Sequence, residues 1–385
     1  MAETILTNGR IVCRDRIIEG GTVVLRDGLI AEVNEGKSDA AAALDLDGDY
    51  LLPGLVELHT DNLERHFLPR PGVFWPSSLG AVLSHDQQMA CAGITTVFDA
   101  ISLGVYEGKE ERRIILGETV AALTRAGKEG VTRAEHFLHL RCEISDPAML
   151  DMFEPHADHP LVRLASVMDH TPGQRQWWDI SKYIEYYKLE AMPAAELETR
   201  LNRLRAAQAK HAGPSRAMVI ETCRARGIAL ASHDDATAEH IEEALEAGIS
   251  ISEFPLSLEV AGLARRHGIK TIMGAPNVVR GRSHSGNMSA SDCAKAGLLD
   301  GLSSDYVPGS LLPAVFILAQ KLGLALPDMV ALASDNLAAM VGLDDRGRIE
   351  AGRRADLLWV KAVAGTAGEL CPVVRQVWRA GARIA

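Results

Sequence analysis

The chain has 385 residues, of which 47% are hydrophobic, and a formal net charge of -11 at pH 7. A chain of this size can bury a large core, which excludes a coiled coil, a disordered protein and a small disulfide-linked domain. Because its charge is spread out, with no long basic run, we expect neither a nucleic acid nor a membrane as a partner.

The first residues, MAETILTNGRIVCRD, alternate like a strand and lack the charged and apolar regions of an export signal. The apolar stretch 311–326 is interrupted by Gln320 and Lys321, which leaves it short of a membrane span. The six cysteines are dispersed with no CxxC pair, as is typical of reduced thiols. We therefore expect a cytoplasmic protein; the sequence leaves its oligomeric state open, with a homodimer as one alternative.

Both ends of the chain have the pattern of short strands separated by turns. In residues 1–50 the runs ETILTNGRIV, GTVVLRDGLIAEV and ALDLDGDYLLP are punctuated by Gly, Asn or Asp, and residues 346–385 repeat this pattern. Neither end carries enough apolar surface to fold alone, and chain termini often lie close together. We predict that both ends form one small β-sandwich domain beside a barrel domain at 51–345.

The long middle alternates apolar, β-rich runs with helical patterns. The runs are LLPGLVELH, ITTVFDA, FLHLRCE, LVRLASVMDH, GIALASHDD, ISISEF, IKTIMGA and LLDGLSSD. Such continuous apolar runs are typical of parallel strands covered on both faces by helices. About eight units of this kind predict an α/β fold of the (β/α)8 TIM barrel type. A doubly wound open sheet is the alternative, but no GxGxxG or GxxxxGK[ST] loop follows any strand.

Several of the predicted strands end in His, Asp or Glu, where barrel enzymes build their active sites. The polar residues at these ends are His59 and Asp61, Glu143, His170, His233 and Asp305. Each alone is equally well a helix cap or a satisfied core group. A ring of unpaired carboxylates would be costly to bury, so together they predict a metal centre.

The nitrogen and oxygen ligand set suits zinc, with manganese or iron as alternatives, and Glu143 is placed to bridge two ions. Such ions lower the pKa of bound water to about 7, and Asp305 could accept the proton of that water. His139 and Arg141 would lie deeper in the same strand as Glu143, and for them a structural role is favoured.

A second polar cluster follows a later strand and contains Asn277, Arg280, Arg282 and His284 among small residues. Arg side chains fit phosphate oxygens bidentately, which predicts a site for a polyphosphate; a solvated surface loop is the alternative. The loop 171–178, which contains Arg175, could cover the barrel mouth. We expect Arg175 to contact the substrate as well.

Three segments, LLPGLVELHTD, ITTVFD and GRIEAGRRADLLWV, resemble the amidohydrolase superfamily, in which a β-sandwich flanks a metal-binding barrel. Within it, HTDNLERH, RAEHFLHLRCE, MDHTPGQRQ, LASHDDAT, MGAPNVVRGRSHSGN and LSSDY resemble the diphosphatases of the carbon–phosphorus lyase pathway of phosphonate catabolism. The resemblance runs over essentially the whole chain.

The resemblance implies that water releases pyrophosphate from α-D-ribose 1-methylphosphonate 5-triphosphate and leaves the 5-phosphate. It also implies metal ligands at the six strand-end positions. The chain departs from most amidohydrolases at two of these: Asp61 replaces the second His of an HxH motif, and Glu143 replaces a carboxylated lysine.

Two other functions remain as alternatives. An amidohydrolase acting on an amide or a cyclic amide would use the same ions to polarise a carbonyl, but a neutral amide needs no Arg cluster. A barrel without catalysis, serving as a scaffold, would have no need for ligands on every expected strand.

Overall fold

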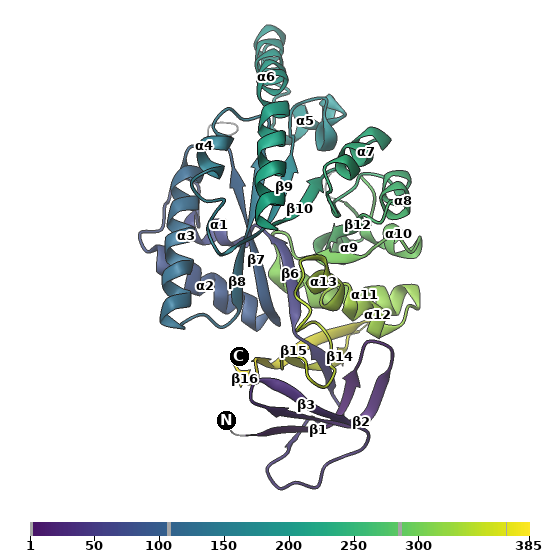
Figure 1. Ribbon diagram of the computed structural model, residues 1–385. Helices are drawn as coiled ribbons and strands as arrows, with labels where there is room; N and C mark the ends of the chain where they lie inside the picture. The colour runs from purple at the N-terminus through teal and green to yellow at the C-terminus, as the bar shows by residue number, and fades with distance from the viewer. Residues whose placement is uncertain (1–2, 106–108, 284–286, 367) are drawn as a thin grey trace.

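The computed structural model describes residues 3–105, 109–283, 287–366 and 368–385, which form a barrel with a separate sheet beside it (Figure 1). Within this part of the chain, eight parallel strands pair in chain order from β6 to β13. They are β6 (Leu55–Thr60), β7 (Ile94–Leu103), β8 (Glu135–Glu143), β9 (Val162–Met168), β10 (Ala229–His233), β11 (Ile251–Glu253), β12 (Lys270–Gly274) and β13 (Gly301–Ser303). A parallel bridge between Thr60 and Asp305 brings the first and last strands together. The predicted barrel is confirmed.

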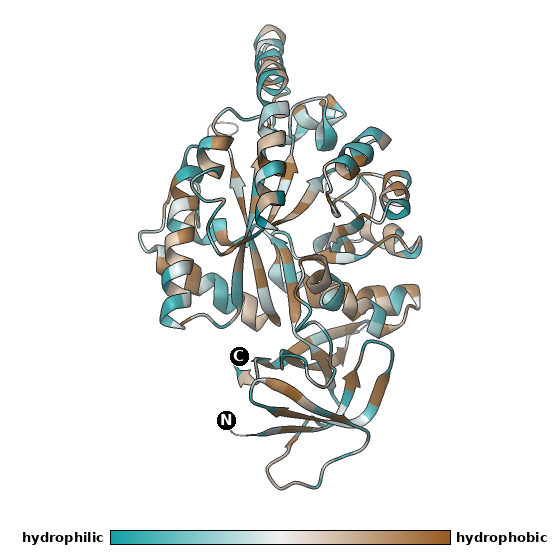
Figure 2. Ribbon diagram, in the orientation of Figure 1, coloured by the Kyte–Doolittle hydropathy of each residue, from teal (hydrophilic) through white to brown (hydrophobic). Residues whose placement is uncertain are grey.

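Helices pack around these strands and bury their apolar side chains. Every position of β6 and β7 is buried, and Figure 2 shows the hydrophobic strands inside a more polar shell of helices. The first part of this shell is α1 (Asn62–Phe67), α2 (Ser78–Cys91), α3 (Glu111–Glu129), α4 (Met149–Phe153), α5 (Ile180–Tyr186) and α6 (Ala194–Arg226). Next come α7 (Ala238–Glu246), α8 (Leu258–Arg266), α9 (Ala275–Arg280), α10 (Ala290–Lys295), α11 (Leu311–Leu322), α12 (Leu326–Ala331) and α13 (Asp335–Met340).

Local sequence signals explain where these helices begin and end. The hydroxyl of Thr237 accepts a hydrogen bond from the backbone of His240 and caps α7. Gly130 and Gly227 end α3 and α6 in the left-handed conformation that glycine adopts without strain. Two single turns of 3-10 helix, η2 (Arg175–Trp177) and η3 (Pro308–Ser310), complete the set. No helix in the described ranges combines the length and apolar character needed to cross a membrane.

Both chain ends join in one sheet below the barrel. Its strands are β1 (Thr4–Val12), β2 (Ile17–Arg26), β3 (Leu29–Asn34), β4 (Leu44–Asp45), β5 (Tyr50–Pro53), β14 (Leu357–Ala364), β15 (Leu370–Arg379) and β16 (Ala382–Arg383). β14 runs antiparallel to β5, and this pairing connects the two ends. The predicted domain of both termini is therefore present. The boundaries near residues 50 and 345 fall close to β5 and β14, and the exact division stays a prediction.

Candidate metal-dependent active site

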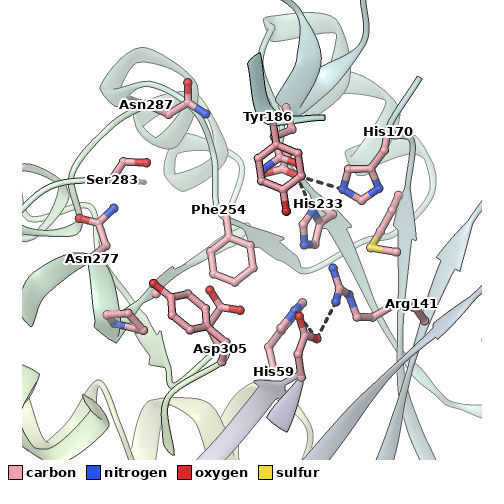
Figure 3. A pocket seen from close by; sticks show the side chains of 18 of the residues that line it. His59, Arg141, His170, Tyr186, His233, Phe254, Asn277, Ser283, Asn287 and Asp305 are labelled. Atoms are coloured by element: carbon pink, nitrogen blue, oxygen red, sulfur yellow. Dashed lines mark hydrogen bonds and ion pairs between the residues drawn. The ribbon is translucent and has the colours of Figure 1, made fainter. Parts of the chain in front are cut away.

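A cavity of about 550 Å³ opens where the barrel strands end. All six residues predicted as metal ligands line it: His59, Asp61, Glu143, His170, His233 and Asp305. In Figure 3, Asn277, Ser283 and Asn287 lie on one side of this cavity, across from His170 and Arg141. The fold thus brings the six side chains to one place, while their roles as ligands stay predictions.

The ends of the first and last strands fix three of these residues. The backbone N–H of Asp305 donates to the carbonyl oxygen of His59 over 3.1 Å, and the N–H of Asp61 donates to the carbonyl of Asp305 over 3.0 Å. Burial, followed by the negative charge of Asp61, raises the pKa of Asp305 to about 7. Asp305 is therefore poised to take up a proton near neutral pH.

His59 is held in one orientation by a carboxylate behind it. Its Nδ1 lies 2.9 Å from Oε1 of Glu253, and burial lowers the pKa of His59 to about 3, so that the ring is neutral. An imidazole whose Nδ1–H is bound by a carboxylate offers the lone pair of Nε2 to a ligand. Nε2 of His59 lies on the side of Asp61, 3.9 Å from its Oδ1.

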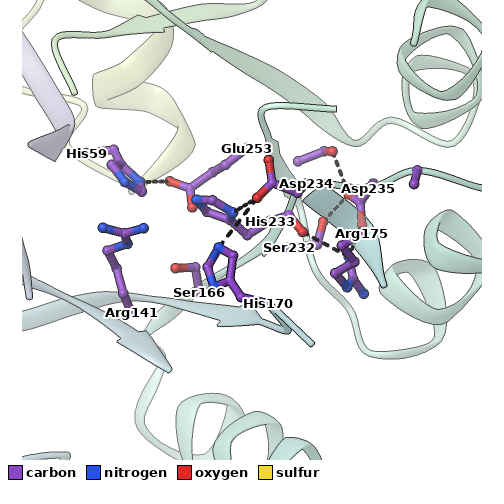
Figure 4. A network of polar contacts seen from close by, with 12 residues as sticks. His59, Arg141, Ser166, His170, Arg175, Ser232, His233, Asp234, Asp235 and Glu253 are labelled. Atoms are coloured by element: carbon purple, nitrogen blue, oxygen red, sulfur yellow. Dashed lines mark hydrogen bonds and ion pairs between the residues drawn. The ribbon is translucent and has the colours of Figure 1, made fainter. Parts of the chain in front are cut away.

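His233 repeats this arrangement with Asp234 as its carboxylate (Figure 4). Its Nδ1 lies 2.7 Å from Oδ2 of Asp234, and burial lowers the pKa of His233. Nε2 of His233 is buried and, among the described residues, has no hydrogen-bond partner. A buried nitrogen lone pair without a partner is costly unless it binds a ligand.

Glu143 and His170 form a close pair in the same cavity. Nδ1 of His170 lies 2.5 Å from Oε2 of Glu143, whose Oε1 accepts a hydrogen bond from the backbone of His170. Burial opposes ionisation of both groups, but each stabilises the charge of the other, so the pKa of Glu143 is lowered and that of His170 is raised. A divalent cation in place of this proton would be stabilised by the negative charge of Glu143.

The residues present fit a divalent metal ion. His170, His233 and Asp234 place one donor atom each within 4.8 Å of one another, and Nε2 of His233 is buried without a hydrogen-bond partner among the described residues. Imidazole nitrogens and carboxylate oxygens are ligands of zinc and related ions. Groups of His, Asp and Glu that could hold a metal are thus part of this cavity.

A structural role was expected for both His139 and Arg141, but only Arg141 lines the cavity. Both nitrogens of His139 have partners: Nδ1 lies 2.8 Å from the carbonyl of Leu58 and Nε2 lies 2.9 Å from Oγ of Ser166. Arg141 instead lines the cavity, and its Nη1 lies 2.5 Å from Oδ1 of Asp61. It therefore contributes a buried positive charge beside the candidate ligands.

Only some of the predicted phosphate-binding residues lie at the cavity. Asn277 and Arg280 line the cavity, and the side-chain oxygen of Asn277 accepts a hydrogen bond from the backbone of Ala290. Arg282 is exposed and is absent from the cavity wall. His284 lies outside the described residues. The structure thus brings two of these four side chains to the cavity.

Arg175 is buried behind the cavity wall. Its Nη1 donates to Oδ1 of Asp235 over 2.6 Å and to the carbonyl of His233 over 3.0 Å (Figure 4). Its neighbours Gln176 and Trp177 line the cavity in its place. The segment that was expected to cover the mouth does lie there, and Arg175 anchors it to the end of β10.

Sequence reasoning did not select Asp234 or Glu253 as site residues, although both end predicted strands. It also gave no role to Lys109 and Arg112, which line the cavity from the segment after β7. The signal for Asp234 was its place in SHDD, directly after a predicted ligand. No motif surrounds Lys109 and Arg112.

Comparison with known structures identifies the fold. An enamidase described as a member of the amidohydrolase superfamily has a TM-score of 0.64 at 15% identity, covering 100% of this chain and 96% of the enamidase. An N-isopropylammelide isopropylaminohydrolase from Burkholderia multivorans has a TM-score of 0.65 at 15% identity, covering 100% and 98% of the two chains. The fold is that of the amidohydrolase superfamily.

Sequence comparison is more specific, although no model of a protein family matches the chain. The α-D-ribose 1-methylphosphonate 5-triphosphate diphosphatase of Escherichia coli is 43% identical over 383 residues, which are 99% of this chain and 100% of the relative. The chain belongs to this family of diphosphatases. An imidazolonepropionase of Rubrobacter xylanophilus is 26% identical over 202 residues, 47% of this chain and 46% of the relative.

Proposed function

We propose that the protein hydrolyses α-D-ribose 1-methylphosphonate 5-triphosphate to the 5-phosphate and pyrophosphate, as part of phosphonate catabolism. Membership of the diphosphatase family over the full chain supports this substrate. The observation that carries the chemistry is the pair His59 and His233: a carboxylate holds Nδ1 of each ring, which leaves Nε2 for a metal ion.

Two divalent ions would be held by His59, Asp61, Glu143, His170, His233 and Asp305. Zinc suits this set of nitrogen and oxygen ligands, with manganese and iron as alternatives. Bound ions of this kind lower the pKa of water and polarise phosphoryl oxygens. Arg141 keeps Asp61 ionised, because its guanidinium offsets burial and lowers the pKa of that carboxyl.

Asp305 accepts the proton of the water that attacks the α phosphorus. A general base works best when its pKa lies near the working pH, and burial raises the pKa of Asp305 above that of an ordinary aspartate. The bond between the α phosphorus and the bridging oxygen breaks, and pyrophosphate leaves. Its growing charge is neutralised by Arg280, with Arg282 and His284 as further predicted contacts.

Two further proposals concern the cellular compartment and the oligomeric state. Six free cysteines support a reducing compartment, and we place the enzyme in the cytoplasm. A homodimer is our proposed assembly, and sedimentation equilibrium tests it.

The function is tested by measuring pyrophosphate release by the metal-loaded protein. ATP and a cyclic amide are assayed separately for comparison. We expect pyrophosphate from the ribosyl methylphosphonate triphosphate, and none after a chelator has removed the metal. Turnover of the amide without pyrophosphate release would instead favour an amide hydrolase.

A further inference from the structure

Two cationic side chains line the cavity on the side of β7 and have no part in the proposed reaction. Lys109 precedes α3 and Arg112 lies in its first turn, and both line the cavity, as does Ser102 of β7. Within the ranges that the structure describes, neither cation has an ion pair, and Nε of Arg112 is buried without a hydrogen-bond partner. These two cations are therefore available to a ligand.

The surroundings of this pair favour an anion. Burial, followed by the positive charge of Arg112, lowers the pKa of Lys109, whereas Glu64 acts in the opposite direction. Glu64 is itself largely shielded from solvent, and burial raises its pKa, so it offsets the two cations only in part. Positive charge held in a partly dry cavity is stabilised when an anionic ligand binds to it.

The barrel separates this pair from the other cationic side of the cavity. Arg280 follows β12, and the path from β7 to β12 passes through β6 and β13. The predicted ligands His59, Asp61 and Asp305 stand at the ends of β6 and β13, between the two cationic sides. A substrate whose α phosphate lies at these ligands can thus place one anionic group on each side.

We propose that Lys109 and Arg112 bind the methylphosphonate group at C1 of the ribose; this subsite rests on the proposed function. The substrate carries a 5-triphosphate and, as an ester of methylphosphonic acid, one further negative charge at C1. The departing pyrophosphate is the more highly charged end, and it matches the side where Asn277, Ser283 and Asn287 line the cavity together with Arg280. The singly charged phosphonate matches the two cations that Glu64 partly offsets.

This subsite selects the substrate. A nucleoside triphosphate presents a neutral base at C1, which leaves Lys109 and the partly buried Arg112 with only the partial compensation that Glu64 provides. A site built to pair with a charged group rejects an analogue that lacks it, because its buried polar groups then remain unpaired. The subsite would therefore make the enzyme strict for the phosphonate.

Kinetics with two substrates test this assignment. The double variant Lys109→Met with Arg112→Met is compared with Arg113→Met, an exposed residue of the same helix that is absent from the cavity wall. We expect the double variant to lower kcat/KM for the phosphonate substrate by about 10- to 100-fold, as for lost contacts to a charged group. The ratio of kcat/KM for this substrate to that for ribose 5-triphosphate, which lacks the phosphonate, should fall by the same factor. Equal losses on both substrates, or no loss on either, would overturn the subsite.

A binding measurement keeps this test independent of catalysis. Ribose 1-methylphosphonate, which has no triphosphate, is titrated into the metal-loaded protein in a calorimeter, with thermal melts to confirm that each variant is folded. We expect binding to the wild type and to Arg113→Met, and at least a tenfold weaker affinity in the double variant. Binding that depends on Arg280 instead would reverse the orientation and contradict the proposal. If the wild type bound this ligand but released no pyrophosphate from the triphosphate, the subsite would stand and the proposed reaction would fail.

Discussion

The backbone N–H of Asp305 donates a hydrogen bond to the carbonyl oxygen of His59, across the junction between the last and first strands of the barrel. The left-handed backbone of Asp305, with φ of 52°, bends the chain at this point. The proposed general base is therefore placed by the same contacts that bring β13 to β6. Its position depends on closure of the barrel and not on a flexible loop.

Replacing Asp305 with asparagine should lower kcat by about 100- to 10,000-fold, the range typical of a lost general base. The amide is nearly isosteric and keeps the backbone contacts, and the other five proposed ligands are unchanged, so the metal should remain bound. Steady-state kinetics combined with metal analysis by mass spectrometry measure both effects. Normal turnover in a metal-replete variant would contradict the role of Asp305.

Asp234→Asn should weaken metal binding by about 10- to 100-fold, because the carboxylate that orients the ring of His233 is lost. Competition with a chromogenic chelator measures this affinity. Glu242→Gln, an exposed carboxylate on α7, is the matched control and should bind metal like the wild type. If the two variants bound metal equally, Asp234 would have no part in orienting the ligand.

Arg175→Met should lower the free energy of unfolding by about 3–5 kcal/mol, because the buried carboxylate of Asp235 loses its positively charged partner and keeps only the hydroxyls of Ser232 and Ser252. Urea unfolding followed by circular dichroism measures the loss. Arg125→Met, which breaks an exposed pair with Glu129, should change stability little. A fully stable Arg175 variant with a raised KM would show instead that Arg175 binds the substrate directly.

A buried network of two histidines and two aspartates, none of which lines the cavity, predicts how stability depends on pH. Asp99 on β7 lies 2.7 Å from Nε2 of His85 and 2.8 Å from Nδ1 of His136, and Nε2 of His136 lies 3.2 Å from Asp86. Burial alone would lower the pKa of His136, but Asp99 and Asp86 raise it to about 9. Folding therefore stabilises the protonated ring of His136.

Because the pKa of His136 is higher in the folded protein, its contribution is complete below about pH 6.5 and is lost as the pH rises through about 9. The free energy of unfolding should fall by up to about 3 kcal/mol over this interval. Urea unfolding at several pH values measures the slope, and His136→Gln, which cannot titrate, should flatten it. If the stability of the wild type and of the His136→Gln variant depended on pH in the same way, His136 would not be the cause.

The barrel could be predicted from sequence because its strands are buried on both faces and appear as continuous apolar runs. The six strand-end residues could be placed at one mouth because parallel strands end on the same side. Asp234 was missed for a physical reason. Successive side chains of a strand point to opposite faces, so the residue after His233 is expected to point away from the cavity. Its φ of 54° breaks that alternation and returns its carboxylate to His233.

Contacts between distant segments could not be predicted. Nothing local shows that Arg175 meets Asp235, or that Lys109 and Arg112 reach the cavity, because these contacts arise only when the barrel closes. Arg175 was assigned to the substrate from its place in a loop, whereas the structure buries it against β10. The charge of a residue was visible in the sequence, but the direction of its side chain was not.

The most direct test of the proposed reaction is hydrolysis of α-D-ribose 1-methylphosphonate 5-triphosphate in water enriched in oxygen-18, followed by phosphorus NMR. Attack at the α phosphorus predicts one pyrophosphate for each 5-phosphate, with the heavy oxygen in the 5-phosphate alone. Release of single phosphate, or heavy oxygen in the pyrophosphate, would contradict the account.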